Sequence, residues 1–273
     1  MFSKKIKNKI RFILEKTFGK KIYLGIMNLY EIFRFRFFTS MKGMFVNKNK
    51  LFKIDNLFFK FPKNSSFHAY GTNFKSHEEV ERGLVLKYIL PNDSILELGG
   101  CLGVISCVAN NILHNKKNHV VVEPNKIAQE FLYFNRNKNN CKFQVEDSII
   151  SNVFKRTEFY VSADFVSSTI FNKNLNSRSN TFMPNTEFID CISFDQIIEK
   201  YNIPFNTLIM DIEGHEYDFI LENDLKLFDK LLIEFHPLIL GKKKIETCKN
   251  SLINKSFNLV ERTGQVEFWA KHS

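Results

Sequence analysis

The residues best suited to chemistry in the first half of the chain stand at the ends of two short apolar runs. Gly99, Gly100 and Gly103 follow the first run, and Glu123 ends the second, 20 residues after Gly103. A glycine turn lets a ligand approach backbone N–H groups at a helix N-terminus. An acid at the end of the second strand can accept hydrogen bonds from both hydroxyls of a ribose. The spacing therefore predicts a site for a ligand that carries a ribose.

The acid before the turn narrows the chemistry of that ligand. Glu97 lies two residues before Gly99, and the glycines do not form a GxGxxG pattern. A carboxylate here would repel a pyrophosphate, but it would suit the sulfonium and amine of S-adenosylmethionine (SAM). The alternative is an ordinary strand–helix turn with a solvated Glu97. Glu97 and Glu123 together favour the SAM interpretation.

A second polar group follows two later apolar runs. Asp211 and Glu213 come after the run at 207–210, and His236 comes after the run at 231–233. Because ligands bind at the carboxyl ends of strands in an open α/β sheet, these residues should face the same crevice as Gly99. His236 could be a general base, a metal ligand shared with Asp211 or Glu213, or a histidine bonded to a neighbouring carboxylate. We expect no metal here, and hence activity that survives a chelator.

Several segments together resemble the FkbM family of SAM-dependent methyltransferases. They are ILELGGCLGVIS, VVVEPN, the tripeptide at 135–137, LIMDIEGHEYDFI at 208–220 and LLIEFHP at 231–237. That family has a D-x-G-A-x-x-G turn, an E-P-N strand end and a later D-x-E-G-x-E signature. The resemblance covers roughly residues 75–270. The departures are Glu97 for aspartate, Gly100-Cys101 for alanine and a polar residue, and Ser148 where alanine is common.

The resemblance implies a fold, a cofactor and a set of site residues. The fold is α/β: a Rossmann-like class I methyltransferase sheet, mostly parallel, with a reversed C-terminal hairpin strand and helices on both faces. The cofactor is SAM, and the acceptor is a hydroxyl of a sugar, glycan or small natural product. The implied cofactor-binding residues are Glu97, Gly99, Gly100, Gly103, Glu123, Asn125, Asp147 and Ser148, and the catalytic residues are Asp211, Glu213 and His236. Among them, Asp147 is the candidate for the adenine amino group, unless it lies in a plain surface turn.

The elements that must position these residues follow from periodicity and turn signals. We expect strands at 94–98, 119–122, 141–145, 157–161, 188–192, 207–210 and 231–233, and a C-terminal hairpin from 256–262 and 265–270. Helices are expected from Ser76 to Leu90, at 104–113, at 125–139, at 195–203 and from about Glu216, where an acid suits the first turn. The polar stretch 162–186 is a candidate lid over the acceptor.

The chain divides into three predicted parts. Residues 1–50 form a basic amphipathic helical arm, 51–90 a hairpin with a lead-in helix, and 91–273 the SAM-dependent methyltransferase domain. Residues 1–63 contain 16 Lys or Arg and 3 Asp or Glu, whereas the rest contains 23 and 26. The near-neutral domain argues against nucleic acid as its substrate. The arm, at 1–46, suits either peripheral contact with an anionic membrane or packing on the domain or a neighbouring subunit.

Two other function classes compete with the methyltransferase. A nucleotide (NAD)-dependent Rossmann oxidoreductase is disfavoured by Glu97, by the absence of GxGxxG and by the C-terminal hairpin. A non-catalytic binding or scaffold protein with the same fold would have little use for Asp211 and Glu213 in a crevice. The five cysteines show no ligand spacing, and no signal-peptide pattern or 18-residue apolar run occurs. A cytoplasmic protein, with or without membrane association, is the expectation, and the sequence does not indicate an oligomeric state.

Overall fold

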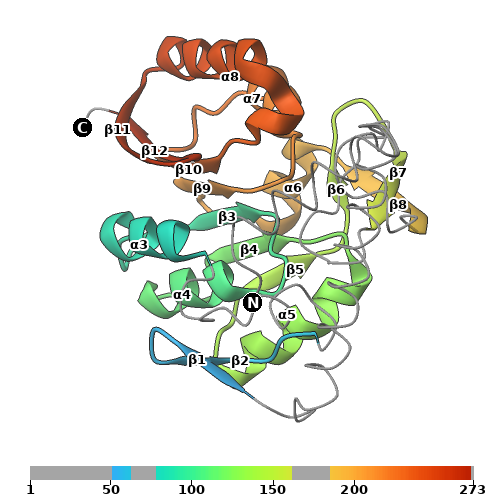
Figure 1. Cartoon of the computed structure of the whole chain (residues 1–273), viewed down its shortest axis with the longest axis vertical. Helices are drawn as coiled ribbons and strands as arrows, with labels where there is room; N and C mark the ends of the chain where they lie inside the picture. The colour runs from blue at the N-terminus through green and yellow to red at the C-terminus, as the bar shows by residue number, and fades with distance from the viewer. Residues whose placement is uncertain (1–50, 63–77, 162–184, 272–273) are drawn as a thin grey trace, which may run out of the picture.

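A computed structural model gives the fold of most of the chain (Figure 1). It describes residues 51–62, 78–161 and 185–271. The predicted arm at 1–50, the predicted helix cap at Ser76 and residues 162–184 of the candidate lid lie outside the described residues.

The centre of the molecule is a seven-stranded sheet in the order β11-β12-β10-β9-β3-β4-β5. Its strands are β3 (Ile95–Leu98), β4 (His119–Val122), β5 (Gln144–Glu146), β9 (Thr207–Met210), β10 (Lys230–Glu234), β11 (Phe257–Thr263) and β12 (Val266–Lys271). The five strands from β10 to β5 in this order pair in parallel, whereas β12 pairs antiparallel with β10 and with β11. The expected mostly parallel sheet with a reversed C-terminal hairpin strand is confirmed.

Helices cover both faces of this sheet (Figure 1). One face carries α3 (Glu79–Tyr88), α4 (Val104–Ile112) and α5 (Lys126–Lys138), and the other carries α6 (Phe194–Tyr201), α7 (Glu216–Glu222) and α8 (Pro237–Asn254). Side chains alternate along each strand. In β3, Ile95 therefore packs under α3 and α4, whereas Leu96 and Leu98 belong to the core beneath α6, α7 and α8. No described helix is both long enough and apolar enough to span a membrane.

The expected N-terminal hairpin is also present, as β1 (Phe52–Ile54) and β2 (Leu57–Phe59). Asp55 and Asn56 both have positive φ, 47° and 65°, which is the conformation of a tight two-residue turn. Asparagine side chains of α5 hold the hairpin, since Asn139 Oδ1 accepts from Phe58 N at 2.8 Å and Asn135 Oδ1 accepts from Lys60 N at 2.7 Å. The hairpin thereby covers the outer side of α5.

Four details differ from the expectation. The third strand begins at Gln144 rather than at Cys141, because Cys141 N still bonds to Arg136 O at the end of α5. The stretch 185–186, expected in a loop, belongs to β8. A small sheet forms in the order β6-β8-β7, from β6 (Ile149–Ile150), β7 (Arg156–Val161) and β8 (Asn185–Ile192), and it stands apart from the main sheet. Helix α8 follows directly after His236 and was not anticipated.

Candidate active site

The glycine turn leads from the carboxyl end of β3 into α4 and lies beside the carboxyl end of β9. Asp211 N donates to Leu98 O at 2.9 Å, so the chain after β9 runs beside the start of the turn. Gly99 has φ +92°, and a Cβ added there would lie 1.8 Å from the carbonyl oxygen of Asp211. Gly103 has φ +80°, and its Cβ would meet Leu132 of α5 at 2.6 Å. Both glycines are therefore required by backbone conformation and by close packing.

Glu123 is buried at the end of β4 and faces this turn. Its Oε2 accepts a hydrogen bond from Cys101 N at 2.6 Å, and its Oε1 accepts one from Asn125 N at 2.8 Å. Burial raises the pKa of Glu123 to about 7, although the two N–H groups act in the opposite direction. A carboxylate has about four lone-pair sites. Glu123 can thus accept further hydrogen bonds, as the ribose hydroxyls of a nucleoside would supply.

The neighbouring polar residues lie along the same edge of the sheet. Asn125 caps α5, because its side chain accepts from the N–H groups of Ile127 and Ala128. Asp147 forms an ion pair with Lys126 in the first turn of that helix, and the Lys126 ammonium lowers the pKa of Asp147. Asp147 is therefore an exposed acid near the start of α5, and its contact with adenine stays a prediction.

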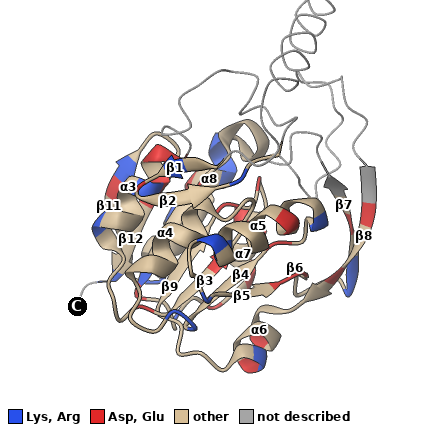
Figure 2. Cartoon of the chain, turned by 90° about the horizontal axis from the view of Figure 1, so that it is seen from below, with Lys and Arg blue, Asp and Glu red and all other residues tan. Residues whose placement is uncertain are grey.

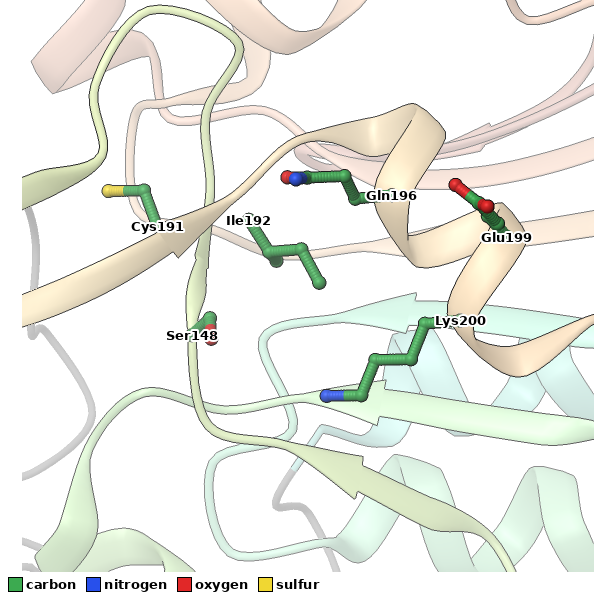
Figure 3. Close-up of a pocket in the computed structure, with 6 residues that line it drawn as sticks. All are labelled: Ser148, Cys191, Ile192, Gln196, Glu199 and Lys200. Carbon is green, nitrogen blue, oxygen red and sulfur yellow. The ribbon is translucent and has the colours of Figure 1, made fainter.

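Ser148 points to the other side of the sheet. Its hydroxyl donates to Glu146 Oε1 at 2.8 Å, and Glu146 Oε2 accepts from Lys200 Nζ of α6 at 2.6 Å. An open pocket of about 500 Å³ lies between the small sheet and α6 (Figure 3). It is lined by Ser148, Cys191, Ile192, Gln196, Glu199 and Lys200. The Ser148 hydroxyl is thus engaged with Glu146, and the cofactor contact predicted for Ser148 stays a prediction.

Glu97 also departs from the expected arrangement. Its side chain is 1% exposed, and it lies beneath α4 on the same face of β3 as Ile95. Ser106 Oγ donates to Glu97 Oε1 at 2.6 Å, and His119 Nε2 lies 2.9 Å from Oε2. Both oxygens are thus engaged inside the protein, because strand alternation turns the side chain into the core rather than into the crevice. The sequence interpretation of Glu97 as a cofactor contact needs this correction.

The second predicted group is brought together at the ends of β9 and β10. His236 Nε2 lies 3.5 Å from Asp211 Oδ1 and 3.5 Å from Glu213 Oε2. The register of the parallel strands explains this contact, since Met210 pairs with Ile233 and both chains continue past the sheet edge. The three residues predicted to be catalytic therefore form one cluster, beside the glycine turn.

The chain after Asp211 is held in an unusual conformation. Glu213 has φ 50°, in the left-handed region that a non-glycine residue adopts at a cost of about 1–2 kcal/mol. Gly214 follows with φ +104°, and a Cβ there would lie 2.3 Å from Ile239 of α8. Strain of this kind gathers at functional sites, where surrounding structure maintains it. The D-x-E-G segment thus places Glu213 at the cluster.

Sequence reasoning missed the role of Glu216, which orients His236. Glu216 begins α7 as expected, and its side chain is fully buried. Its Oε1 accepts from Gly214 N at 3.0 Å and lies 2.9 Å from His236 Nδ1. Burial opposes a charge on His236, but Glu216, Asp211 and Glu213 outweigh it and raise the pKa to about 9.

Three more acids of the cluster were not predicted as site residues. Glu234 is the last residue of β10, while Glu78 and Glu81 stand at the start of α3. Burial, followed by the charges of Glu234 and Glu78, raises the pKa of Glu81 to about 7. The available signal was Glu234 itself, because an acid ending the strand next to Asp211 must lie near it. The α3 acids carried no such signal, since acids are common in a first turn.

The parallel sheet, the glycine turn and the buried acid after the second strand define a SAM-dependent methyltransferase. The family model described as the methyltransferase FkbM domain matches residues 97–263, which is more than half of the chain. The chain therefore belongs to the FkbM methyltransferase family. Comparison with curated proteins yields no significant sequence match.

Solved structures with a similar arrangement are methyltransferases. A ribosomal protein L11 methylase from Lactobacillus delbrueckii subsp. bulgaricus has 9% identity and TM-score 0.42, over 74% of this chain and 81% of that one. An O-methyltransferase from Bacillus cereus in complex with SAH has 12% identity and TM-score 0.43, over 71% and 82%. A putative rRNA-methylase from Clostridium thermocellum has 7% identity and TM-score 0.45, over 74% and 99%. Sequence identities and TM-scores this low do not indicate which acceptor the chain methylates.

The residues at the turn fit the cofactor of this family. SAM, when bound, supplies an activated methyl group on a sulfonium. We propose that Glu123 binds the ribose hydroxyls and that Asn125, Asp147 and the backbone of Gly99, Gly100 and Gly103 contact the rest of the cofactor. The cluster at Asp211 lies beside Gly99, and we propose that it faces the acceptor.

Proposed function

We propose that this methyltransferase transfers the methyl group of SAM to a hydroxyl of a sugar, glycan or small natural product. The observation that carries the proposal is the contact between the glycine turn and the cluster at Asp211. Asp211 directly abuts Gly99, since the Asp211 carbonyl oxygen occupies the space where a Gly99 side chain would stand. An acceptor beside Asp211 is therefore also beside the SAM turn, and alignment of the two reactants supplies much of the catalysis.

The chain's own residues then have separable roles. The acceptor hydroxyl attacks the methyl carbon, the bond from that carbon to sulfur breaks, and the hydroxyl proton passes to the protein. Asp211 and His236 are the proposed proton acceptors, with Glu213 beside them, and His236 can take the proton only in its neutral form, because its pKa is raised to about 9. Glu216 fixes the His236 ring through Nδ1, so that Nε2 faces the acceptor. A hydroxyl needs such a base more than a carboxylate acceptor would.

The charge of the cluster supports a neutral acceptor. Asp211, Glu213, Glu216, Glu234, Glu78 and Glu81 affect one another's or His236's pKa. Such an acidic crevice repels phosphates and carboxylates. Positions of Lys or Arg and of Asp or Glu both occur over the described elements in Figure 2. These features favour a glycan or small neutral molecule over RNA or DNA.

A methyl-transfer screen tests the proposal. The full chain is incubated with methyl-labelled SAM and with neutral glycosides, acidic glycosides, small phenols and total RNA, and label in each product is counted. Labelled neutral glycosides or alcohols carrying an O-methyl signal by NMR are the expected result. Label confined to RNA, or to N-methyl products, would contradict it.

The basic arm is the one part of the proposal that concerns location. We propose that residues 1–46, which lie outside the described residues, hold the protein at an anionic membrane surface through their Lys and Arg residues. Removing these residues should abolish sedimentation with anionic vesicles and leave SAM binding intact. Equal sedimentation of both forms would remove this idea, and aggregation of the shortened form would indicate that the arm packs on the domain.

A further inference from the structure

Three side chains of the cluster have the types and spacing of metal ligands. Among the described residues, Asp211, Glu234 and His236 each offer one ligand atom, and these atoms lie within 4.8 Å of one another. Met210 pairs with Ile233 in the parallel register, so Asp211 and Glu234 follow side by side. We propose that these three residues bind a divalent cation that prefers oxygen and imidazole ligands, such as Mn²⁺ or Mg²⁺.

The orientation of His236 supports this assignment. Glu216 Oε1 accepts the N–H of Gly214 and lies 2.9 Å from His236 Nδ1, so Nδ1 is the donating nitrogen. Nε2 is then the nitrogen that faces Asp211, at 3.5 Å from Oδ1, and a bound cation would displace the Nε2 proton. A carboxylate that fixes the outer nitrogen of a histidine is the usual second shell of a metal-bound imidazole. His236 is therefore already oriented as a ligand through Nε2.

One oxygen of Asp211 lacks a hydrogen bond. The Asp211 side chain is 42% exposed as a whole, but its Oδ1 is buried and receives no hydrogen bond from the described residues. A buried acceptor without a partner is destabilising. Oδ1 is also the oxygen that faces His236 Nε2, so a cation placed between them would satisfy both groups.

The charges around these three residues also favour a bound cation. Glu213, Glu216, Glu78 and Glu81 supplement the two carboxylates, and His236 is the basic side chain that opposes them within the described cluster. A divalent cation would offset this accumulated negative charge more fully than one proton on His236 can.

A cation here would change one part of the proposed function, because Asp211 and His236 would then act as its ligands rather than as proton acceptors. It would lie beside Asp211 and hence beside the SAM turn, where binding an acceptor hydroxyl would lower the pKa of that hydroxyl. This consequence rests on the proposed function, whereas cation binding does not. The inference also reverses the expectation of a metal-free site, because that expectation did not include Glu234.

Direct titration of the full chain with Mn²⁺ tests the site. The protein is stripped with EDTA, dialysed and titrated by calorimetry, and free Mn²⁺ is followed by its electron paramagnetic resonance signal. We expect one Mn²⁺ per chain, and binding weakened at least about tenfold in Glu234→Gln and in His236→Gln. The matched controls are Glu222→Gln, an exposed acid of α7, and His114→Gln, an exposed histidine, and both should bind as the wild type does.

The possible outcomes separate the explanations. No Mn²⁺ retained by the wild type, or equal binding by Glu234→Gln and the wild type, overturns the proposal and leaves His236 as a protonated partner of the acids. Should Glu234→Gln fail to fold, His236→Gln and the Mn²⁺-induced rise in the melting temperature of the wild type decide instead. Because neither SAM nor an acceptor is present, a failure here leaves the proposed function standing.

Discussion

The two ends of the crevice are built in different ways. At the ends of β3 and β4, the buried Glu123 carboxylate receives backbone N–H groups from Cys101 and Asn125. At the ends of β9 and β10, Asp211, Glu234 and His236 face one another, and Asp211 Oδ1 receives no hydrogen bond from the described residues. At the first end, backbone N–H groups already bond to the Glu123 carboxylate before a ligand binds. At the second end, the Asp211 and Glu234 carboxyl groups lie close together. The Glu123 end therefore suits a cofactor that is the same in every reaction. The Asp211 end suits the acceptor that reacts.

The largest expected effect concerns Gly99, where the two ends meet. In Gly99→Ala, the new Cβ would lie 1.8 Å from the Asp211 carbonyl oxygen at φ +92°, so the turn must separate from β9. We expect a loss of about 3 kcal/mol or more in the free energy of unfolding, together with loss of SAM binding and turnover. Thermal melting and calorimetry measure both.

The matched control for this change is Gly83→Ala. A Cβ at Gly83, inside α3, meets no atom within 4 Å. Alanine is the better helix former, so this variant should be about 0.5–1 kcal/mol more stable than the wild type. If Gly99→Ala melts like the wild type and still binds SAM, the two ends do not depend on this contact.

Next in size is the chemistry at the end of β9. Asp211→Asn and His236→Ala should each lower turnover by roughly 10²–10⁴-fold, the usual contribution of a general base. SAM affinity should change little, because it rests on the other end of the crevice. Steady-state rates on an identified acceptor provide the measurement. Wild-type rates in both variants would show that positioning alone carries the catalysis and that these residues are structural.

A smaller effect is expected for Glu97, whose substitution should lower stability and leave SAM binding nearly unchanged. Glu97→Gln weakens the buried contacts with Ser106 and His119, so the free energy of unfolding should fall by about 1–3 kcal/mol. SAM affinity should stay within about twofold of the wild type. A variant that melts normally but binds SAM much more weakly would show that Glu97 contributes to the cofactor site.

The smallest expected effect is the pH dependence of SAM binding. Burial places the pKa of Glu123 near 7 in the free protein, and its ionised form accepts hydrogen bonds from hydroxyls more strongly. As pH rises from 6 to 8, Glu123 loses its proton and SAM should bind several-fold more tightly. Calorimetry at several pH values should show this trend in the wild type but not in Glu123→Gln. An equal trend in both would assign the titration to another group.

Much of the fold and of the cofactor end could be predicted because their requirements are local. β4 and β9 occupy the predicted ranges 119–122 and 207–210, since each is a short apolar run bounded by turn residues. Gly99 and Gly103 are needed for positive φ, which is a property that the sequence displays directly. The reversed strand β12 followed from the hairpin signal at Thr263-Gly264.

The missing parts depend on contacts between distant segments. Glu97 was misplaced because its partner His119 lies one strand away, and only the register shows that both side chains face α4. Glu216 was expected to be an acid suited to the first turn of its helix, yet its side chain is fully buried and lies 2.9 Å from His236 Nδ1. The small sheet contains β6, a strand of two residues, which is too short to show any period. The cluster of Asp211, Glu234 and His236 emerges only when β9 and β10 are placed side by side.

The most direct test of the division between the two ends is calorimetry of SAM binding to three proteins: wild type, Glu123→Ala and Asp211→Asn. Removing Glu123 should weaken SAM binding by on the order of 2–3 kcal/mol, the scale of hydrogen bonds to a charged group. Asp211→Asn should bind SAM within about twofold of the wild type. The reverse pattern, with SAM affinity unchanged in a folded Glu123→Ala and lost in Asp211→Asn, would contradict the account, because the cofactor would then bind at the end assigned to the acceptor.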